Sequence, residues 1–290
     1  MSNPQYKGII CMLICAILWS TAGILIKLLP WNPLVISGMR SLIAGCVYYL
    51  YMRHEKTRFI INKNSILSGI FLMGTFLFYI AANKFTTSAN AIVLQYSAPI
   101  FIIIISWVIF RQRFRAGDII TVAATFIGIA LFFLDDLSAG YKLGNLMAIG
   151  SGICFACMFI TTGRADKDSR SSGIFLGNVF TAAVGIPFMF FSETTISTTT
   201  IFAILALGIF QLGLSYIFYG IAVQYISSLS CSLIGCIEPL LNPFWVFLII
   251  GEVPGLFALI GGVIVISCIF INQLGPGGAG GRWKRSGARD

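Results

Sequence analysis

Ten long and almost uninterrupted apolar runs fill most of this 290-residue chain. Each run approaches the roughly 20 apolar residues that an α-helix needs to cross the hydrocarbon core of a bilayer. Inside hydrocarbon the backbone hydrogen bonds have to be made within the segment, which favours helices. We therefore expect an all-α integral membrane protein with ten transmembrane helices. Their approximate limits are 8–29, 34–52, 65–82, 89–110, 118–134, 144–163, 173–191, 201–223, 229–250 and 255–271.

The composition excludes a soluble globular enzyme. Hydrophobic residues make up 58% of the chain and charged residues 10%, against about 45–50% and about 25% in soluble domains. The sequence also lacks a phosphate-binding loop of the G-x-x-x-x-G-K-S/T type, a nucleophile elbow and a metal-ligand cluster. We expect no catalytic residue, no cofactor and no metal site.

The positive charges follow an alternating pattern along the connections between the runs. Eleven Lys and Arg residues fall on one side of the ten spans, and two, Lys84 and Lys142, fall on the other. Positive residues concentrate in cytoplasmic loops, so both termini are predicted in the cytoplasm. This pattern accounts for most of the net charge of +9 without a nucleic-acid partner. The eleven are Lys7, Arg53, Lys56, Arg58, Lys63, Arg111, Arg113, Arg115, Arg164, Lys167 and Arg170.

The two halves of the chain repeat one another. With an offset of 140, the segment 78–82 aligns with 218–222, and Pro99 aligns with Pro239. Each half contains five spans, and because five is odd the halves must face opposite ways. Such inverted repeats are typical of transporters with alternating access. The predicted units are residues 1–137, residues 138–274 and a Gly-rich basic tail at 275–290, which is either native or an added linker.

Several short segments resemble the EamA family of the drug/metabolite transporter superfamily. They are Trp19-Ser20 with Lys27, Pro33 and Arg40, then Ala91-Ile92-Val93-Leu94-Gln95-Tyr96-Ser97-Ala98-Pro99, and finally Glu238-Pro239 with Gly251-Glu252. The resemblance covers about 270 residues. It implies export or exchange of small metabolites, prominently amino acids, across a bacterial inner membrane. The first half has Arg111-Gln112 where the second has Gly251-Glu252. The first half therefore lacks the glutamate that the resemblance implies at this position, which argues against an essential role for it in that half.

Three charged residues lie inside apolar runs, where a charge costs several kcal/mol unless it is paired or hydrated. Glu238 lies near the middle of the ninth run and could bind a substrate amine or carry a proton. Alternatively it bonds backbone groups freed by Pro239 or pairs with Arg40. Arg40 is either a carboxylate clamp or a structural ion-pair member. Lys27, at the end of the first run, either takes part in coupling or extends toward the membrane surface.

Pro99, Pro239 and Pro243 are predicted to kink the fourth and ninth spans, because proline removes a backbone hydrogen bond. Kinks at equivalent places in the two halves suggest hinges beside a central path, and static packing kinks are the alternative. Polar and aromatic side chains near these prolines are candidates for a substrate cavity, although lipid contact or helix packing suits each alone. They are Trp19, Tyr79, Asn90, Gln95, Tyr96, Phe155, Gln211, Tyr216, Tyr219 and Glu238.

Together these features predict a secondary transporter that moves a small polar or zwitterionic metabolite, an amino acid or related amine, with protons as a possible coupling ion. A transporter of a larger solute, such as a sugar conjugate or an amphipathic drug, is the alternative within the class. A membrane-embedded enzyme or receptor is the alternative outside it. Membrane lipid and a small-molecule substrate are the expected partners.

Overall fold

The computed structural model is helical throughout its spans. It describes residues 4–137, 139–241, 245 and 255–274, apart from the side chains at positions 27 and 274. Eight helical segments are long and apolar enough to cross a bilayer. Two shorter apolar helices, Ala116–Phe132 and Ser228–Leu241, occupy the positions of the fifth and ninth predicted spans. The ten-helix prediction is confirmed.

The first half contains seven α-helices and a short 3₁₀-helix in its described residues. In chain order these are α1 (Pro4–Ser20), α2 (Ala22–Lys27), α3 (Pro33–His54), α4 (Lys63–Phe85), α5 (Ser88–Gln95), α6 (Ala98–Phe110), α7 (Ala116–Phe132) and η1 (Leu134–Asp136).

The second half follows in its described residues. Its elements are α8 (Lys142–Arg164), α9 (Lys167–Gly185), the 3₁₀-helix η2 (Ile186–Phe191), α10 (Thr198–Ala206), the π-helical segment η3 (Leu207–Leu214), α11 (Ser215–Ala222), α12 (Ser228–Gly235) and α14 (Leu256–Leu274). A further helical turn covers residues 237–241.

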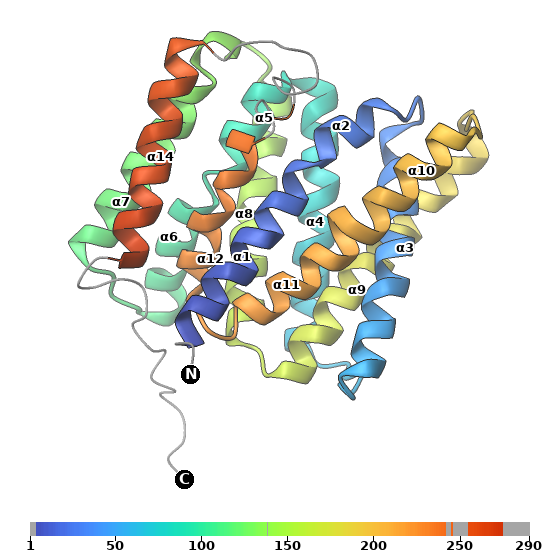
Figure 1. Ribbon diagram of the computed structural model, residues 1–290, viewed down its shortest axis with the longest axis horizontal. Coiled ribbons are helices and arrows are strands. Elements are labelled where there is room, and N and C mark those ends of the chain that lie inside the picture. The colour runs from blue at the N-terminus through green and yellow to red at the C-terminus, as the bar shows by residue number, and fades with distance from the viewer. Residues whose placement is uncertain (1–3, 138, 242–244, 246–254, 275–290) are drawn as a thin grey trace.

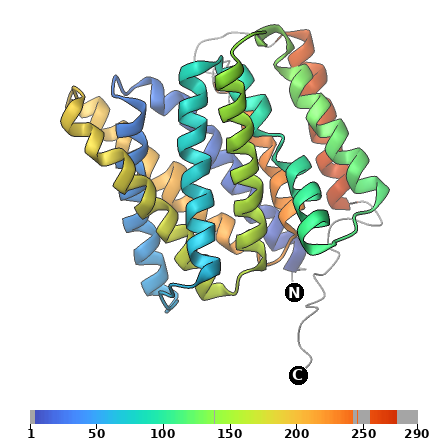
Figure 2. The ribbon, with the colours of Figure 1, turned by 180° about the vertical axis from the view of Figure 1, so that it is seen from behind.

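The helices pack in pairs that recur in both halves (Figures 1 and 2). The contact of α1 with α11 corresponds to the contact of α8 with α4. In the same way, the contact of α3 with η3 corresponds to the contact of α9 with α4. The pairs α3–α9 and α7–α14 each join equivalent helices of the two halves. In Figure 1 the α7–α14 pair forms one side of the bundle, and α3, α9 and α10 form the opposite side. The structure is therefore a pair of inverted five-helix repeats.

Glycine permits the close crossing of α3 and α9. A Cβ atom on Gly38 would lie 2.6 Å from the backbone carbonyl carbon of Gly185. The α7–α14 crossing is similar, because a Cβ on Gly128 would lie 3.2 Å from the carbonyl oxygen of Gly261. Small residues at such crossings allow membrane helices to approach closely.

The fourth and ninth spans are interrupted at equivalent positions. Helices α5 and α12 are each eight residues long, begin after the hydroxyl caps Thr87 and Ser227, and end at the C-caps Tyr96 and Cys236. A proline ring clashes with the carbonyl four residues earlier, and Gln95 and Gly235 stand four residues before Pro99 and Pro239. The kinks predicted from the sequence are thus complete breaks one turn before each proline.

Two further spans depart from a continuous α-helix. The first breaks at Thr21, where the hydroxyls of Ser20 and Thr21 donate to the carbonyls of Ile17 and Leu18 at 2.7 Å. Such local bonds compete with the helical ladder. The eighth span contains η3, and short π-helical stretches are frequent at functional sites. Pro243, Gly251-Glu252 and the tail at 275–290 lie outside the described residues.

Candidate functional site

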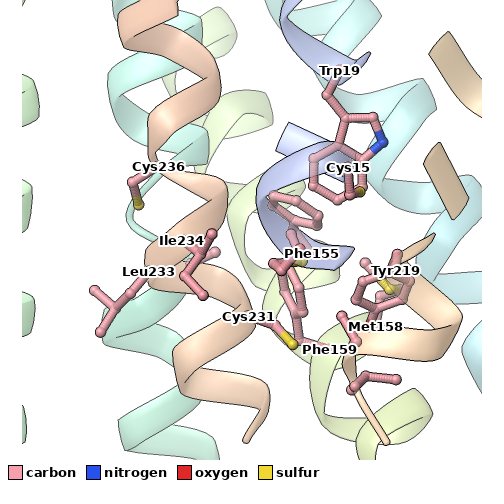
Figure 3. Close-up of a cluster of buried hydrophobic side chains, with 14 of the residues drawn as sticks. Cys15, Trp19, Phe155, Met158, Phe159, Tyr219, Cys231, Leu233, Ile234 and Cys236 are labelled. Atoms are coloured by element: carbon pink, nitrogen blue, oxygen red, sulfur yellow. The ribbon is translucent and has the colours of Figure 1, made fainter. Parts of the chain in front are cut away.

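A cluster of aromatic rings lies in the interior between the two halves (Figure 3). Every ring in it is at most 6% exposed, so the cluster is closed to solvent in this conformation. The breaks in the helices bring it together, because Tyr96 stands between α5 and α6 while the other rings come from α1, α8 and α11. We call it the ring cluster; its members are Trp19, Tyr96, Phe155, Phe159, Tyr216 and Tyr219.

Trp19 is the centre of the ring cluster. Its ring centroid lies 5.4 Å from that of Tyr216, 5.9 Å from Phe155 and 6.3 Å from Tyr219. Phe155 in turn lies 6.3 Å from Tyr96 in an edge-on arrangement. Tilted and edge-on pairs at 4.5–7 Å are the favoured aromatic geometry. Six of the ten predicted cavity residues therefore belong to one connected site, since Glu238 bonds to Tyr96.

Glu238 follows the break after α12 and is half-buried. The hydroxyl of Tyr96 donates to its Oε2 atom at 2.5 Å. A hydrogen bond to a carboxylate is about twice as strong as a neutral one. The ring cluster is thus bonded to a carboxyl group.

Arg40 also lies beside the ring cluster, which it reaches through Phe76. Its guanidinium carbon lies 5.4 Å from the ring centroid of Phe76, and that ring lies 6.0 Å from Tyr216. No carboxylate within the described ranges lies within 4.0 Å of Arg40, so the direct ion pair with Glu238 is not formed. The two charges still interact electrostatically across the cluster.

Three buried polar atoms of predicted site residues find no hydrogen-bond partner in the part of the chain that the structure describes. They are Trp19 Nε1, Arg40 Nε and Gln211 Oε1. Buried polar groups are nearly always paired, and each exception calls for a physical reason such as an absent ligand or water. The Trp19 and Arg40 donors lie at the rings, whereas Gln211 belongs to η3.

Two other predicted residues have partners elsewhere in the bundle. Asn90 Nδ2 donates to Thr86 Oγ1 at 3.1 Å and to Asn145 Oδ1 at 3.2 Å. Gln95 Nε2 donates to Ser151 Oγ at 2.8 Å. These bonds tie α5 to α8 rather than extend the ring cluster.

Tyr79 packs in a small satellite cluster around Ala82, Ala91 and Ala148. Its sequence partner in the repeat, Tyr219, belongs to the ring cluster, so the two tyrosines are not equivalent in packing. Lys27 is the last residue of α2, and its side chain is outside the description.

Two residues of the site were not predicted. Phe76, which connects Arg40 to Tyr216, is one of 25 phenylalanines and carries no sequence signal. Arg170 was counted with a connection on the basic side, but the structure places it within a helix. It lies in the first turns of α9, is 7% exposed, and donates to the carbonyls of Thr162 at 2.8 Å and Ala165 at 2.7 Å.

An apolar groove of about 670 Å³ runs between α1, α14 and the end of α7. Its walls include Leu13, Phe132 and Val263, and Ile237 beside Glu238 also contributes. In a bilayer such a groove contacts acyl chains, and it lies next to the polar site without supplying polar groups to it.

A ten-helix membrane protein with inverted halves and an embedded polar site has the architecture of a secondary transporter. The family model described as the EamA-like transporter family matches residues 6–134 and again residues 142–273. The chain belongs to this family. It is accordingly a membrane transporter of small molecules rather than an enzyme.

Two curated relatives are similar over most of their length. An uncharacterized inner membrane transporter, YicL, of Salmonella typhimurium is 23% identical, with 92% of this chain and 95% of the relative covered. An uncharacterized transporter of Archaeoglobus fulgidus is 22% identical over 91% and 95% of the two chains. A solved crystal structure superposes with a TM-score of 0.79 at 17% identity, covering 92% of this chain and 98% of the other. At that identity the likeness shows the fold alone.

Proposed function

We propose that this transporter moves a small zwitterionic metabolite, an amino acid or a related amine, by alternating access. In this proposal the substrate binds at the ring cluster, its ammonium group near Glu238 and its carboxylate near Arg40. The two halves rock about this site and expose it to each side of the membrane in turn.

The observation that carries the proposal is the placement of two opposite charges beside one ring cluster without a direct ion pair between them in the described residues. Glu238 is bonded only by the neutral Tyr96 hydroxyl in the described residues, and Arg40 only faces an aromatic ring. Embedded charges need compensation, and a zwitterion would compensate both at once. The unpartnered donors at Trp19 Nε1 and Arg40 Nε suit a carboxylate acceptor.

Proton coupling through Glu238 is part of the proposal. An embedded carboxyl group can bind either a proton or a substrate ammonium group, and competition between the two would couple their fluxes. A facilitator without coupling uses the same site but leaves Glu238 in one charge state.

The experiment is a binding and flux comparison on the reconstituted protein. Thermal unfolding in detergent is measured with amino acids, with the matching decarboxylated amines and with sugars, because a ligand that binds only the folded state raises its stability. We expect the strongest stabilisation by amino acids, weaker stabilisation by the matching amines and none by sugars. Flux into proteoliposomes with and without a pH gradient then tests coupling. Stabilisation by none of these solutes together with absent flux would refute the proposal.

An amphipathic solute is the second candidate, and the apolar groove beside Glu238 favours it. Ile237 lines the groove directly before Glu238 in the chain. A cationic amphipath could place its chain in the groove and its amine at the carboxylate. Stabilisation by long-chain amines in preference to amino acids would identify this candidate.

We further propose that both termini lie in the cytoplasm of a bacterium and that the chain resides in the inner membrane. The excess of Lys and Arg in alternate loops supports this orientation. The start of α1 and the end of α14 lie at the same end of the bundle (Figure 1). Reporter fusions after residue 274 and within the 138–141 connection should report opposite compartments.

A further inference from the structure

We propose that Arg170 is a positioning residue that closes the ring cluster from the end of the bundle carrying the basic loops. It acts through Thr162 on Tyr219. This inference rests on the proposed alternating access, since a closure has meaning only if the same end opens in the cycle.

The Arg170 guanidinium holds the C-terminal end of α8. Its Nε and Nη2 atoms donate to the carbonyls of Thr162 and Ala165, which stand in the last helical turn of α8 and just beyond it. The last carbonyls of a helix have no intrahelical donor and need partners. Arginine offers several donors in a rigid planar fork, so one side chain fixes two carbonyls in a defined geometry.

Thr162 transmits this position to the ring cluster. Its hydroxyl is hydrogen-bonded to the hydroxyl of Tyr219, and both side chains are fully buried. Tyr219 belongs to α11, whereas Thr162 belongs to α8, so the bond crosses between helices. Tyr219 packs its ring 5.4 Å from Phe159 and 5.8 Å from Tyr216.

Further contacts between helices surround the bond between Thr162 and Tyr219. We call this bond and the contacts around it the layer. Ser228 Oγ, in the first turn of α12, donates to the Phe159 carbonyl at 2.8 Å. Tyr48 of α3 is 1% exposed, and a Cβ on Gly220 would lie 3.0 Å from its hydroxyl. Helices α3, α8, α9, α11 and α12 therefore meet here without a water-accessible gap around these side chains.

This layer lies at the basic end of the protein. The connection between α3 and α4 docks on the start of α9, where Asn62 Nδ2 donates to Ser169 Oγ at 2.7 Å and Lys167 bonds Glu55 at 3.0 Å. Arg170 follows Ser169 directly. Any opening toward this end has to move Tyr219 away from Thr162, and Arg170 opposes that movement by fixing the α8 end.

Cys231 offers a direct readout of this opening. It is fully buried on α12 and points toward Phe159 in Figure 3. Cys236 is equally buried, but it points to the other side of the same helix. Alkylation of Cys231 by N-ethylmaleimide in proteoliposomes, resolved from Cys236 by peptide mass spectrometry, measures how often the layer opens.

The test compares Thr162→Val and Arg170→Lys with wild type and with Thr161→Val. Thr161 is the matched control, because its hydroxyl bonds only to the Cys157 and Met158 carbonyls of its own helix. Loss of one neutral buried hydrogen bond shifts an equilibrium about fivefold. We expect Cys231 labelling to rise about fivefold in Thr162→Val, to rise also in Arg170→Lys, and to stay at the wild-type rate in Thr161→Val.

Two results would overturn the inference. One is wild-type labelling of Cys231 in a folded Thr162→Val protein, with folding checked by circular dichroism. The other is an equal rise at Cys231 and Cys236, which indicates general loosening. The labelling requires no substrate, so a wrong substrate assignment leaves this test intact.

Discussion

The hydroxyl of Tyr96 donates a 2.5 Å hydrogen bond to Glu238 Oε2, joining residues 142 positions apart in the two halves. Both residues lie at the breaks of the two equivalent spans. Tyr96 is the C-cap of α5, and Glu238 comes two residues after Cys236, the C-cap of α12. The two breaks therefore face each other across the interior. In the proposed transport cycle, a change in the charge or occupancy of Glu238 would act directly on this contact between the halves.

Replacing Glu238 by Gln is expected to abolish the stimulation of substrate flux by a pH gradient, because the amide cannot exchange a proton. Tyr96→Phe keeps the carboxyl group but removes its donor, and a hydrogen bond to a charged group is worth about 1.5–3 kcal/mol. We expect substrate affinity to change about tenfold or more in that variant while the pH-gradient effect persists. Flux in proteoliposomes measures both.

Glu193→Gln is the matched control for the Glu238 variant, because Glu193 is exposed in the connection before α10. It should behave as wild type. Proton-gradient stimulation that survives Glu238→Gln would rule out this residue as the coupling group.

Arg40→Lys is expected to weaken the binding of amino acids about tenfold while leaving the weaker binding of the corresponding amines unchanged. Lysine keeps the charge but loses the planar fork that matches a carboxylate, and it stacks less well on Phe76. Arg164→Lys is the comparison, since Arg164 also lies over a ring, that of Phe110, but at the exposed end of α8. Thermal stabilisation by each ligand provides the measurement. Equal loss for amines and amino acids would argue against a carboxylate partner for Arg40.

Gly38→Ala is expected to lower the free energy of unfolding by about 1–3 kcal/mol, the usual cost of overpacking. The added methyl group would meet the Gly185 backbone at 2.6 Å, and backbone cannot rotate away as a side chain can. Gly117→Ala is the control, because nothing lies within 4 Å of a Cβ there and alanine favours a helix over glycine. Thermal unfolding in detergent should rank Gly117→Ala at or above wild type. Unchanged stability of Gly38→Ala would mean that α3 and α9 separate easily.

The spans and the repeat could be predicted because apolar runs of membrane length and an ungapped offset are properties of composition and spacing. The sequence led us to expect the kinks in the fourth and ninth spans at the prolines themselves, whereas the structure has the breaks one turn earlier. The steric clash of Pro99 acts four residues earlier, on the Gln95 carbonyl, and the apolar pattern does not change there.

The types of residue that form the site could be predicted from the sequence, but the directions in which their side chains point could not. Asn90 and Tyr96 both belong to the fourth span, yet six residues are about one and two-thirds helical turns. Asn90 therefore points toward Asn145 while Tyr96 points toward Glu238. Which face of a helix meets which neighbour depends on packing against residues far away in the sequence. The sequence of a single protein therefore does not show it.

Asp166 provides a test outside the membrane spans. Its carboxylate caps α9, accepting from Ser169 Oγ at 2.6 Å and from the backbone N–H groups of Asp168 and Ser169 at 3.0 Å. The Ser169 hydroxyl, followed by the Ser169 backbone N–H, holds the pKa of Asp166 below its usual value. Asp166→Ala is expected to reduce the free energy of unfolding by about 1 kcal/mol at pH 7, whereas Asp166→Asn keeps an oxygen acceptor and most of the stability.

The sign of the pH effect follows from the lowered pKa of Asp166. The ionised cap stabilises the folded state above the unfolded pKa, which is about 3.9, and this contribution is lost as the pH falls through the lower folded pKa. The stability gap between wild type and Asp166→Ala should therefore be constant from pH 7 to about pH 5 and shrink below about pH 4. Thermal unfolding of both proteins across that range measures it. A gap that widens on acidification would show that the neutral acid, rather than the carboxylate, is the stabilising cap.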